Sequence, residues 1–145
     1  LHVRCRVTDQ EHNGDHTGPH IWKNDSIQFG LDPMNGRNWS EYTFSLTGDG
    51  AAAWNHNPPE GFKSGKFDGA CSVTRRGNLT EYSFTIPPER LGFELKDGTQ
   101  FRIALLINDS DGGIRSRTML FFDGLDGHKD TGKFGLVQLR SGRRK

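Results

Sequence analysis

Two side chains near the start of the chain could together bind a small polar ligand. Trp22 precedes Gln28 by six residues, in the segment His20-Ile-Trp-Lys-Asn-Asp-Ser-Ile-Gln-Phe-Gly-Leu-Asp32. In an extended strand, the apolar residues that alternate with Gln28 point to one side and Gln28 points to the other, wet side. A loop-borne Trp offers a flat apolar platform, and an outward Gln offers hydrogen bonds. This combination is typical of sugar recognition.

The elements that must hold these side chains are strands. Nine short segments with strand character are separated by Gly, Pro, Asn and Asp turns. They are Leu1–Thr8, Ser26–Leu31, Glu41–Leu46, Ala51–Trp54, Ala70–Arg75, Thr80–Ile86, Gln100–Asn108, Arg115–Phe122 and Gly132–Leu139. The pattern predicts an all-β, antiparallel β-sandwich of two sheets, of the immunoglobulin or jelly-roll kind, with one face of each sheet buried and the other wet. Only Pro87–Leu91 predicts a helical turn.

Composition limits the classes of partner. The chain has 145 residues, a length typical of one domain, with 19 Lys and Arg against 18 Asp and Glu. A net charge of +1 provides no broad field for nucleic acid or a membrane surface. Residues 1–140 are expected to form the domain and 141–145 a solvated basic tail. We therefore expect a neutral, polar partner.

Five motifs in chain order resemble the family 9 carbohydrate-binding modules. They are Val7-Thr-Asp9, Trp22-Lys-Asn-Asp-Ser-Ile-Gln28, Glu81-Tyr-Ser-Phe-Thr-Ile-Pro87, Leu106-Ile-Asn-Asp109 and Lys133-Phe-Gly135. The resemblance implies a noncatalytic β-sandwich that binds the end of a polysaccharide or oligosaccharide and holds structural calcium. It places Trp22 in one wall of an aromatic clamp and Gln28 at the position of a ligand-bonding Glu.

The resemblance also places His128 where the family has a second clamp Trp. Trp54 and Trp39, both at strand edges, are alternative candidates for this second wall. Each of the two could instead pack at the rim of the sandwich, and His128 could be an ordinary loop residue.

Carboxylates supply a candidate metal site. Calcium takes six to eight oxygen ligands, commonly from Asp side chains and backbone carbonyls. The resemblance implies calcium near Asp9 and Asp25, with Asn108 and Asp109 as further candidate ligands. Acidic turns without a bound metal are also common, so the alternative is an ordinary loop.

Enzymatic motifs are missing from the sequence. We find no Gly-rich phosphate loop, no Gly-x-Ser-x-Gly elbow and no Cys-His pair in a recognisable context, so we predict no enzyme. Two alternatives stay open. One is a structural sandwich that packs against a catalytic neighbour, and the other is a haem-binding redox sandwich with Met34 and a His as ligands.

The setting of the domain follows from the same reasoning. The first residues form a strand instead of a signal peptide or a leading turn, and the family has two more strands before this point. We expect a domain of a larger extracellular or periplasmic protein, covalently joined to other domains. Cys5 and Cys71 are both expected on apolar strand faces, and the sequence leaves open whether they pair.

Overall fold

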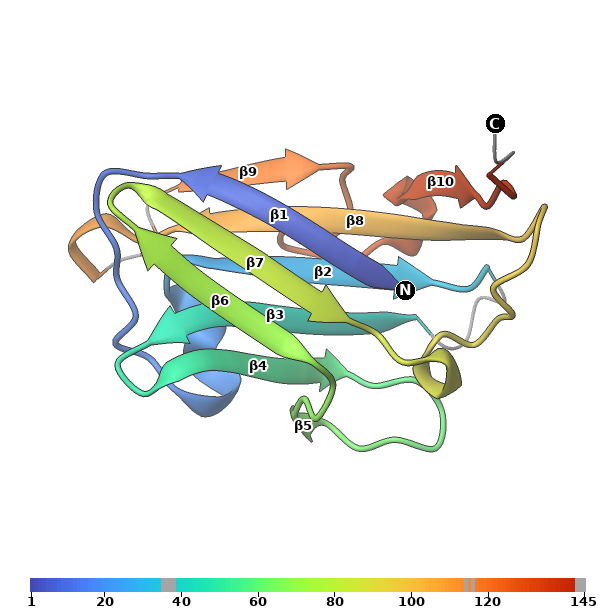
Figure 1. The fold of residues 1–145 in the computed structure, drawn as a ribbon, viewed down its shortest axis with the longest axis horizontal. Helices are drawn as coiled ribbons and strands as arrows, with labels where there is room; N and C mark the ends of the chain where they lie inside the picture. The colour runs from blue at the N-terminus through green and yellow to red at the C-terminus, as the bar shows by residue number, and fades with distance from the viewer. Residues whose placement is uncertain (35–38, 114, 116, 143–145) are drawn as a thin grey trace.

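The chain folds into two antiparallel sheets that face each other. The computed structural model describes residues 1–34, 39–113, 115 and 117–142, so the last three residues of the basic tail lie outside the described residues. The smaller sheet has the order β1-β7-β6 and crosses in front of the larger one (Figure 1). Its strands are β1 (His2–Thr8), β6 (Cys71–Arg76) and β7 (Leu79–Thr85).

The larger sheet has the order β10-β8-β2-β3-β4-β5, with β9 also paired to β8. Its strands are β2 (Ser26–Asp32), β3 (Ser40–Thr47), β4 (Gly50–Asn57), β5 (Gly65–Lys66), β8 (Gln100–Asp109), β9 (Arg117–Phe121) and β10 (Gly135–Gln138). Four short 3₁₀ helices connect the strands: η1 (Gly18–Lys23), η2 (Pro88–Arg90), η3 (Asp111–Gly113) and η4 (Thr131–Lys133).

The predicted sandwich is confirmed. Each of the nine predicted segments overlaps a strand, and the predicted turn at Pro87–Leu91 contains η2. The two-residue strand β5 and the helix η1 were not predicted. β5 is too short for an alternating pattern, and η1 is one 3₁₀ segment whose only buried residue is Ile21.

Aromatic rings join the two sheets. Phe44 of the large sheet stacks on Phe84 of the small sheet with ring centroids 3.9 Å apart, and Phe29 meets Phe84 edge-on. Cys5 and Cys71 pack against this core and are free. Because β7 lies between their strands, the two backbones are about two strand spacings apart, roughly 9–10 Å, which is too far for a disulfide.

The outer face of the large sheet is covered, which corrects the prediction of one wet face for each sheet. Every residue of β2 is buried. The segment between β9 and β10, which we call the covering loop, folds across this face. Its Leu125 and Phe134 pack with Ala104 and Leu106 in a second apolar cluster. A Cβ on Gly30 would lie 2.7 Å from the Phe134 ring, so only Gly allows this ring to approach the sheet. The outward face of the small sheet is wet as predicted.

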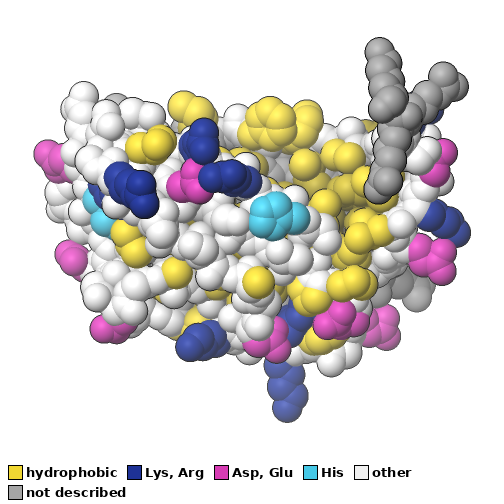
Figure 2. Space-filling model, viewed as in Figure 1, with side chains coloured by type: hydrophobic (Ala, Val, Ile, Leu, Met, Phe, Trp, Pro, Cys, Tyr) yellow, Lys and Arg dark blue, Asp and Glu magenta, His cyan; other side chains and the backbone are white. Residues whose placement is uncertain are grey.

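The edge formed by β9 and β10 exposes apolar side chains. β8 pairs with β10 over its first residues and with β9 over its last ones. Met119 is 68% exposed, and Phe121 and Leu136 are also exposed. Figure 2 shows hydrophobic side chains gathered along this edge of the molecule. Within the described residues, no helix has the length and apolar character needed to cross a membrane.

Candidate functional site

A cavity of about 370 Å³ opens on the covered outer face of the large sheet. We call it the outer cavity. The predicted ligand residues Trp22 and Gln28 both line it, although they come from a helix and a strand. Its full lining is Trp22, Gln28, Glu41, His56, Arg115, Leu125, Asp126, Gly127 and Lys129.

Trp22 forms an aromatic wall of the outer cavity. It lies in η1, where Pro19 presets the first turn and the buried side chain of Ile21 anchors the helix to the sandwich. The Arg115 guanidinium lies 5.7 Å from the centroid of the Trp22 ring, and Lys23 Nζ lies 5.6 Å from it. Both distances are within the range of cation–π attraction, which holds the ring in place.

Gln28 lies on the floor of the outer cavity. Its side chain points away from the sandwich core, as predicted, but only 6% of the residue is exposed because the outer face is covered. Its Nε2 donates to Glu41 Oε1 at 2.6 Å, and its Oε1 accepts from Asn108 Nδ2 at 3.1 Å. The amide is therefore fixed in one orientation.

Glu41 and Lys129 form an ion pair beside Gln28. Glu41 is 5% exposed, and its Oε1 accepts a hydrogen bond from Lys129 Nζ at 2.9 Å in addition to the one from Gln28. Lys129 also donates to the backbone carbonyl of Leu125 at 2.5 Å, which ties its loop to the sheet. A carboxylate that is so deeply buried is costly to desolvate, and the ammonium group compensates its charge.

The rim of the outer cavity carries two more polar groups. His56 Nε2 lies 3.0 Å from Thr43 Oγ1, and burial lowers the pKa of His56 below its ordinary value of 6.5, so the ring is neutral at neutral pH. Arg115 Nη2 donates to Asp126 Oδ1 at 2.8 Å, and this hydrogen bond lowers the pKa of Asp126. The two carboxylates of the cavity are thus each paired with one cation.

The other three predicted ligand residues do not line the outer cavity. Trp54, on β4, lies beside η1, with Cζ3 3.8 Å from the position of a Cβ on Gly18. Trp39 packs edge-on against Phe134, with ring centroids 6.1 Å apart, and supports the second apolar cluster. His128 is exposed on the covering loop, between the lining residues Gly127 and Lys129.

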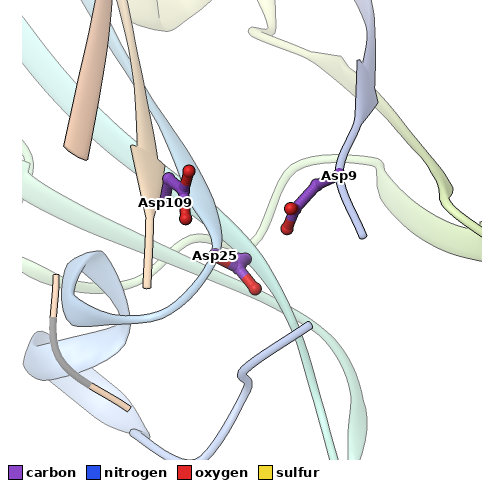
Figure 3. A group of neighbouring side chains, drawn as sticks. All are labelled: Asp9, Asp25 and Asp109. Atoms are coloured by element: carbon purple, nitrogen blue, oxygen red, sulfur yellow. The ribbon is translucent and has the colours of Figure 1, made fainter. Parts of the chain in front are cut away.

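Three predicted metal ligands converge in a second pocket, which we call the acidic pocket. Asp9 follows β1, Asp25 precedes β2 and Asp109 ends β8 (Figure 3). One carboxylate oxygen from each lies within 4.8 Å of the others. Calcium binds oxygen at about 2.3–2.6 Å, so oxygens around one ion are separated by up to about twice that distance. The spacing of the trio fits a calcium ion.

Asp25 also organises the loops around the acidic pocket. Its Oδ2 accepts from the Asn13 amide at 2.5 Å and its Oδ1 accepts from the Ser110 amide at 2.7 Å. Burial raises the pKa of Asp25, although these two hydrogen bonds and the nearby His12 act in the opposite direction. A cation in the pocket would compensate the buried charge.

Asn108, the fourth predicted metal ligand, lies between the two pockets. It lines the acidic pocket, but its Nδ2 donates to Ser26 Oγ at 3.0 Å and to Gln28 Oε1. Alternation along β8 directs Asn108 to the outer face and Asp109 to the opposite face. The Asn108 side chain therefore belongs to the hydrogen-bond network of the outer cavity.

The haem alternative has no support in the linings of the outer cavity and the acidic pocket. Met34 is 42% exposed and lines neither pocket. Met119 lines the acidic pocket and His56 lines the outer cavity, so neither pocket combines a Met with a His.

Sequence reasoning missed Glu41, Lys129, His56, Arg115 and Asp126 as lining residues. Glu41 alternates with Tyr42, so it points outward from its strand as Gln28 does from its own, and this is a usable signal. The pairing of Gln28 with Thr43 makes Glu41 its diagonal neighbour on β3, and this register was unknown from sequence. Asp126 and Lys129 reach the cavity because the covering loop folds over the sheet, and Arg115 reaches it from the segment before β9.

The fold is similar to two solved structures. They are a family 9 carbohydrate-binding module from Caldicellulosiruptor kristjanssonii in complex with glucose and in complex with cellotriose. Both have a TM-score of 0.72, and both alignments cover 99% of this chain. The glucose complex is 16% identical and 72% of its chain is covered, and the cellotriose complex is 17% identical and 70% of its chain is covered. No curated protein matches the sequence.

A family model gives the membership of the chain. The model described as carbohydrate family 9 binding domain-like matches residues 1–142, nearly the whole chain. The predicted resemblance is thereby confirmed: the chain belongs to the carbohydrate family 9 binding domain-like family.

Proposed function

We propose that this domain binds the end of a carbohydrate chain in the outer cavity and does so without catalysis. One observation carries the proposal: the family-9-like fold brings Trp22, Gln28 and the covering loop together around a single cavity. An aromatic wall beside fixed polar groups suits a pyranose, whose C–H groups stack while its hydroxyls form hydrogen bonds.

A glucan end is the ligand that we propose first. The similar modules were solved with glucose and cellotriose, and a cavity of about 370 Å³ has room for one or two sugar rings. Contacts of this number give weak binding, on the order of micromolar to millimolar. A titration with cellotriose that follows Trp fluorescence and heat release tests the proposal directly.

The variant Trp22→Ala should lower the affinity for cellotriose at least about tenfold, because a stacking platform is lost. Trp54→Ala is the matched control, since Trp54 lies outside the cavity and the variant should bind as the unchanged protein does. Equal affinity of the Trp22→Ala variant would refute the role of Trp22. Prolonged incubation with cellotriose should leave the sugar intact, and released glucose would refute the noncatalytic assignment.

We propose calcium as a structural ion in the acidic pocket. The geometry of Asp9, Asp25 and Asp109 supports this, because one carboxylate oxygen from each lies within 4.8 Å of the others. Calcium should raise the melting temperature and EDTA should lower it. Magnesium should be less effective, because it demands a smaller octahedral site. Equal melting curves with calcium and EDTA would remove the proposal.

We further propose that the domain acts outside the cytoplasm, where polysaccharides are found, as one part of a longer polypeptide. The exposed edge formed by Met119, Phe121 and Leu136 favours a second role, packing against an attached domain. Replacing Met119 and Phe121 by Gln should leave cellotriose binding unchanged. In the longer polypeptide the same replacements should speed hydrogen exchange at the domain boundary.

A further inference from the structure

We infer that Glu41 and Lys129, more than Gln28, make the directional hydrogen bonds to the sugar, and that they select two hydroxyls on adjacent carbons. The inference rests on the proposed function of the outer cavity and adds the residues and the ligand chemistry. Neither Glu41 nor Lys129 belongs to the motifs that carry the family resemblance.

Gln28 has the character of a positioning residue. Each end of its amide is already held by a protein partner, Nε2 by Glu41 and Oε1 by Asn108. The amide keeps a second N–H and a second lone pair, but hydrogen bonds from these neutral groups are weaker than the charge-assisted bonds that Glu41 and Lys129 can form. Gln28 therefore orients Glu41 more readily than it binds the sugar.

Glu41 retains an acceptor that faces the cavity. Its Oε1 accepts both hydrogen bonds, from Gln28 and from Lys129. Within the described part of the chain, no hydrogen bond reaches its Oε2. Glu41 lines the cavity and is 5% exposed, so a carboxylate oxygen there with two lone-pair positions is a strong acceptor for a sugar hydroxyl.

Lys129 retains a donor next to this acceptor. The ammonium group has three N–H bonds, of which two go to Glu41 Oε1 and to the Leu125 carbonyl. The pair thus presents one acceptor and one donor side by side. Two neighbouring hydroxyls of a pyranose match this arrangement, because one can donate to Glu41 while the other accepts from Lys129.

The charge balance of the cavity points to a neutral sugar. Glu41 is paired with Lys129 and Asp126 with Arg115, at 2.9 and 2.8 Å. No net charge remains from these pairs to attract a uronic acid, and Glu41 would repel its carboxylate. The ligand class is therefore a neutral sugar with a free vicinal diol.

The test uses Glu41→Gln and Lys129→Met in the full 145-residue chain, titrated with cellotriose and with monodeoxy glucoses. Each variant should lose roughly ten- to hundredfold in affinity, the effect of one charge-assisted hydrogen bond. One of the deoxy glucoses lacks the hydroxyl that Glu41 binds, and it should bind the unchanged protein weakly. Its affinity should not fall further in the Glu41→Gln variant, because both changes remove the same hydrogen bond.

Glu94→Gln is the matched control, because Glu94 forms the same kind of pair with Lys96 at 2.9 Å but on the exposed surface. It should bind as the unchanged protein does. Circular dichroism and the melting temperature confirm that each variant is folded, and Lys129→Met carries the test if Glu41→Gln does not fold. Unchanged affinity in both variants, while Trp22→Ala still abolishes binding, would overturn this inference and leave the proposed function standing. Failure of the unchanged protein to bind any sugar would overturn both.

Discussion

The two pockets are lined by different strands, β2, β3 and β4 for the outer cavity and β1, β7, β8 and β9 for the acidic pocket, and they differ in how their charges are arranged. The acidic pocket brings together three carboxylates, whose oxygens lie within 4.8 Å of one another, and backbone amides donate to Asp25. The outer cavity contains two carboxylates, each paired with a cation. Like charges at close range favour a bound cation, whereas paired charges leave hydrogen-bonding capacity for a neutral ligand. The contrast supports both proposals, a metal ion in the acidic pocket and a sugar in the outer cavity.

The pockets also differ in what builds them. The acidic pocket is formed where three strands end, so its geometry depends on the sheet framework. The outer cavity needs the covering loop as its second wall, and this loop is held by Phe134 on Gly30 and by Lys129 on Glu41. Asn108 connects the two, because it lines the acidic pocket and fixes Gln28 in the outer cavity. Disruption of the acidic pocket should therefore disturb the outer cavity more than disruption of the outer cavity disturbs the acidic pocket.

The largest effect is expected from Asp25→Ala. The change removes the acceptor of the Asn13 and Ser110 amides and should lower the free energy of unfolding by about 2–4 kcal/mol. It should also abolish stabilisation by calcium. Urea unfolding with calcium and with EDTA measures both effects. Asp49→Ala, in the exposed turn between β3 and β4, is the control and should change neither. If calcium still stabilises the Asp25→Ala variant, the ion does not bind in the acidic pocket.

A smaller effect, confined to the outer cavity, is expected from Gly30→Ala. The added Cβ would lie 2.7 Å from the Phe134 ring and displace the covering loop, at a cost of about 1–3 kcal/mol. Cellotriose affinity should fall, while the melting-temperature shift caused by calcium should persist. Gly48→Ala is the control, because nothing lies within 4 Å of its added Cβ. Loss of the calcium response in Gly30→Ala would show that the pockets are coupled in both directions.

The calcium response should depend on pH. Burial raises the pKa of Asp25 above its ordinary value of 3.8, so the metal-free folded state binds a proton more tightly than the unfolded chain. Protonation of Asp25 therefore stabilises the metal-free folded state below pH 3.8. This stabilisation is lost as the pH rises through the raised pKa of Asp25. Calcium binds the ionised form, so its effect on the melting temperature should be larger at neutral pH than near pH 3.8. A shift of the same size at both pH values would argue against Asp25 as a ligand.

The smallest effect is expected from salt on sugar binding. A neutral ligand in a cavity of paired charges should change its affinity less than about twofold between low and high salt, whereas calcium affinity should fall clearly. Isothermal titration of both ligands at two salt concentrations measures the difference. A steep salt dependence of cellotriose binding would contradict the charge balance that we assign to the outer cavity.

The strands and the sandwich follow from the sequence because alternation and turn residues are local signals. Clear alternation in β1, β3 and β7 predicted which side chains form the core. Trp22 and Gln28, the predicted ligand residues, both line the outer cavity. The prediction that the outer face of the large sheet is wet was wrong, because alternation reports the polarity of a face and not whether another segment covers it.

The sequence by itself determined the sandwich and the family, since strand period and motif spacing carry this information. The resemblance and the residue types also named Trp22, Gln28, Asp9, Asp25 and Asp109 as candidate ligands. Only the tertiary structure decided that Trp39, Trp54 and His128 lie away from the outer cavity, and that Glu41 and Lys129 meet there. These two residues are far apart in the chain and come together through strand register and the path of one loop. Such long-range contacts leave no periodic signal in a single sequence.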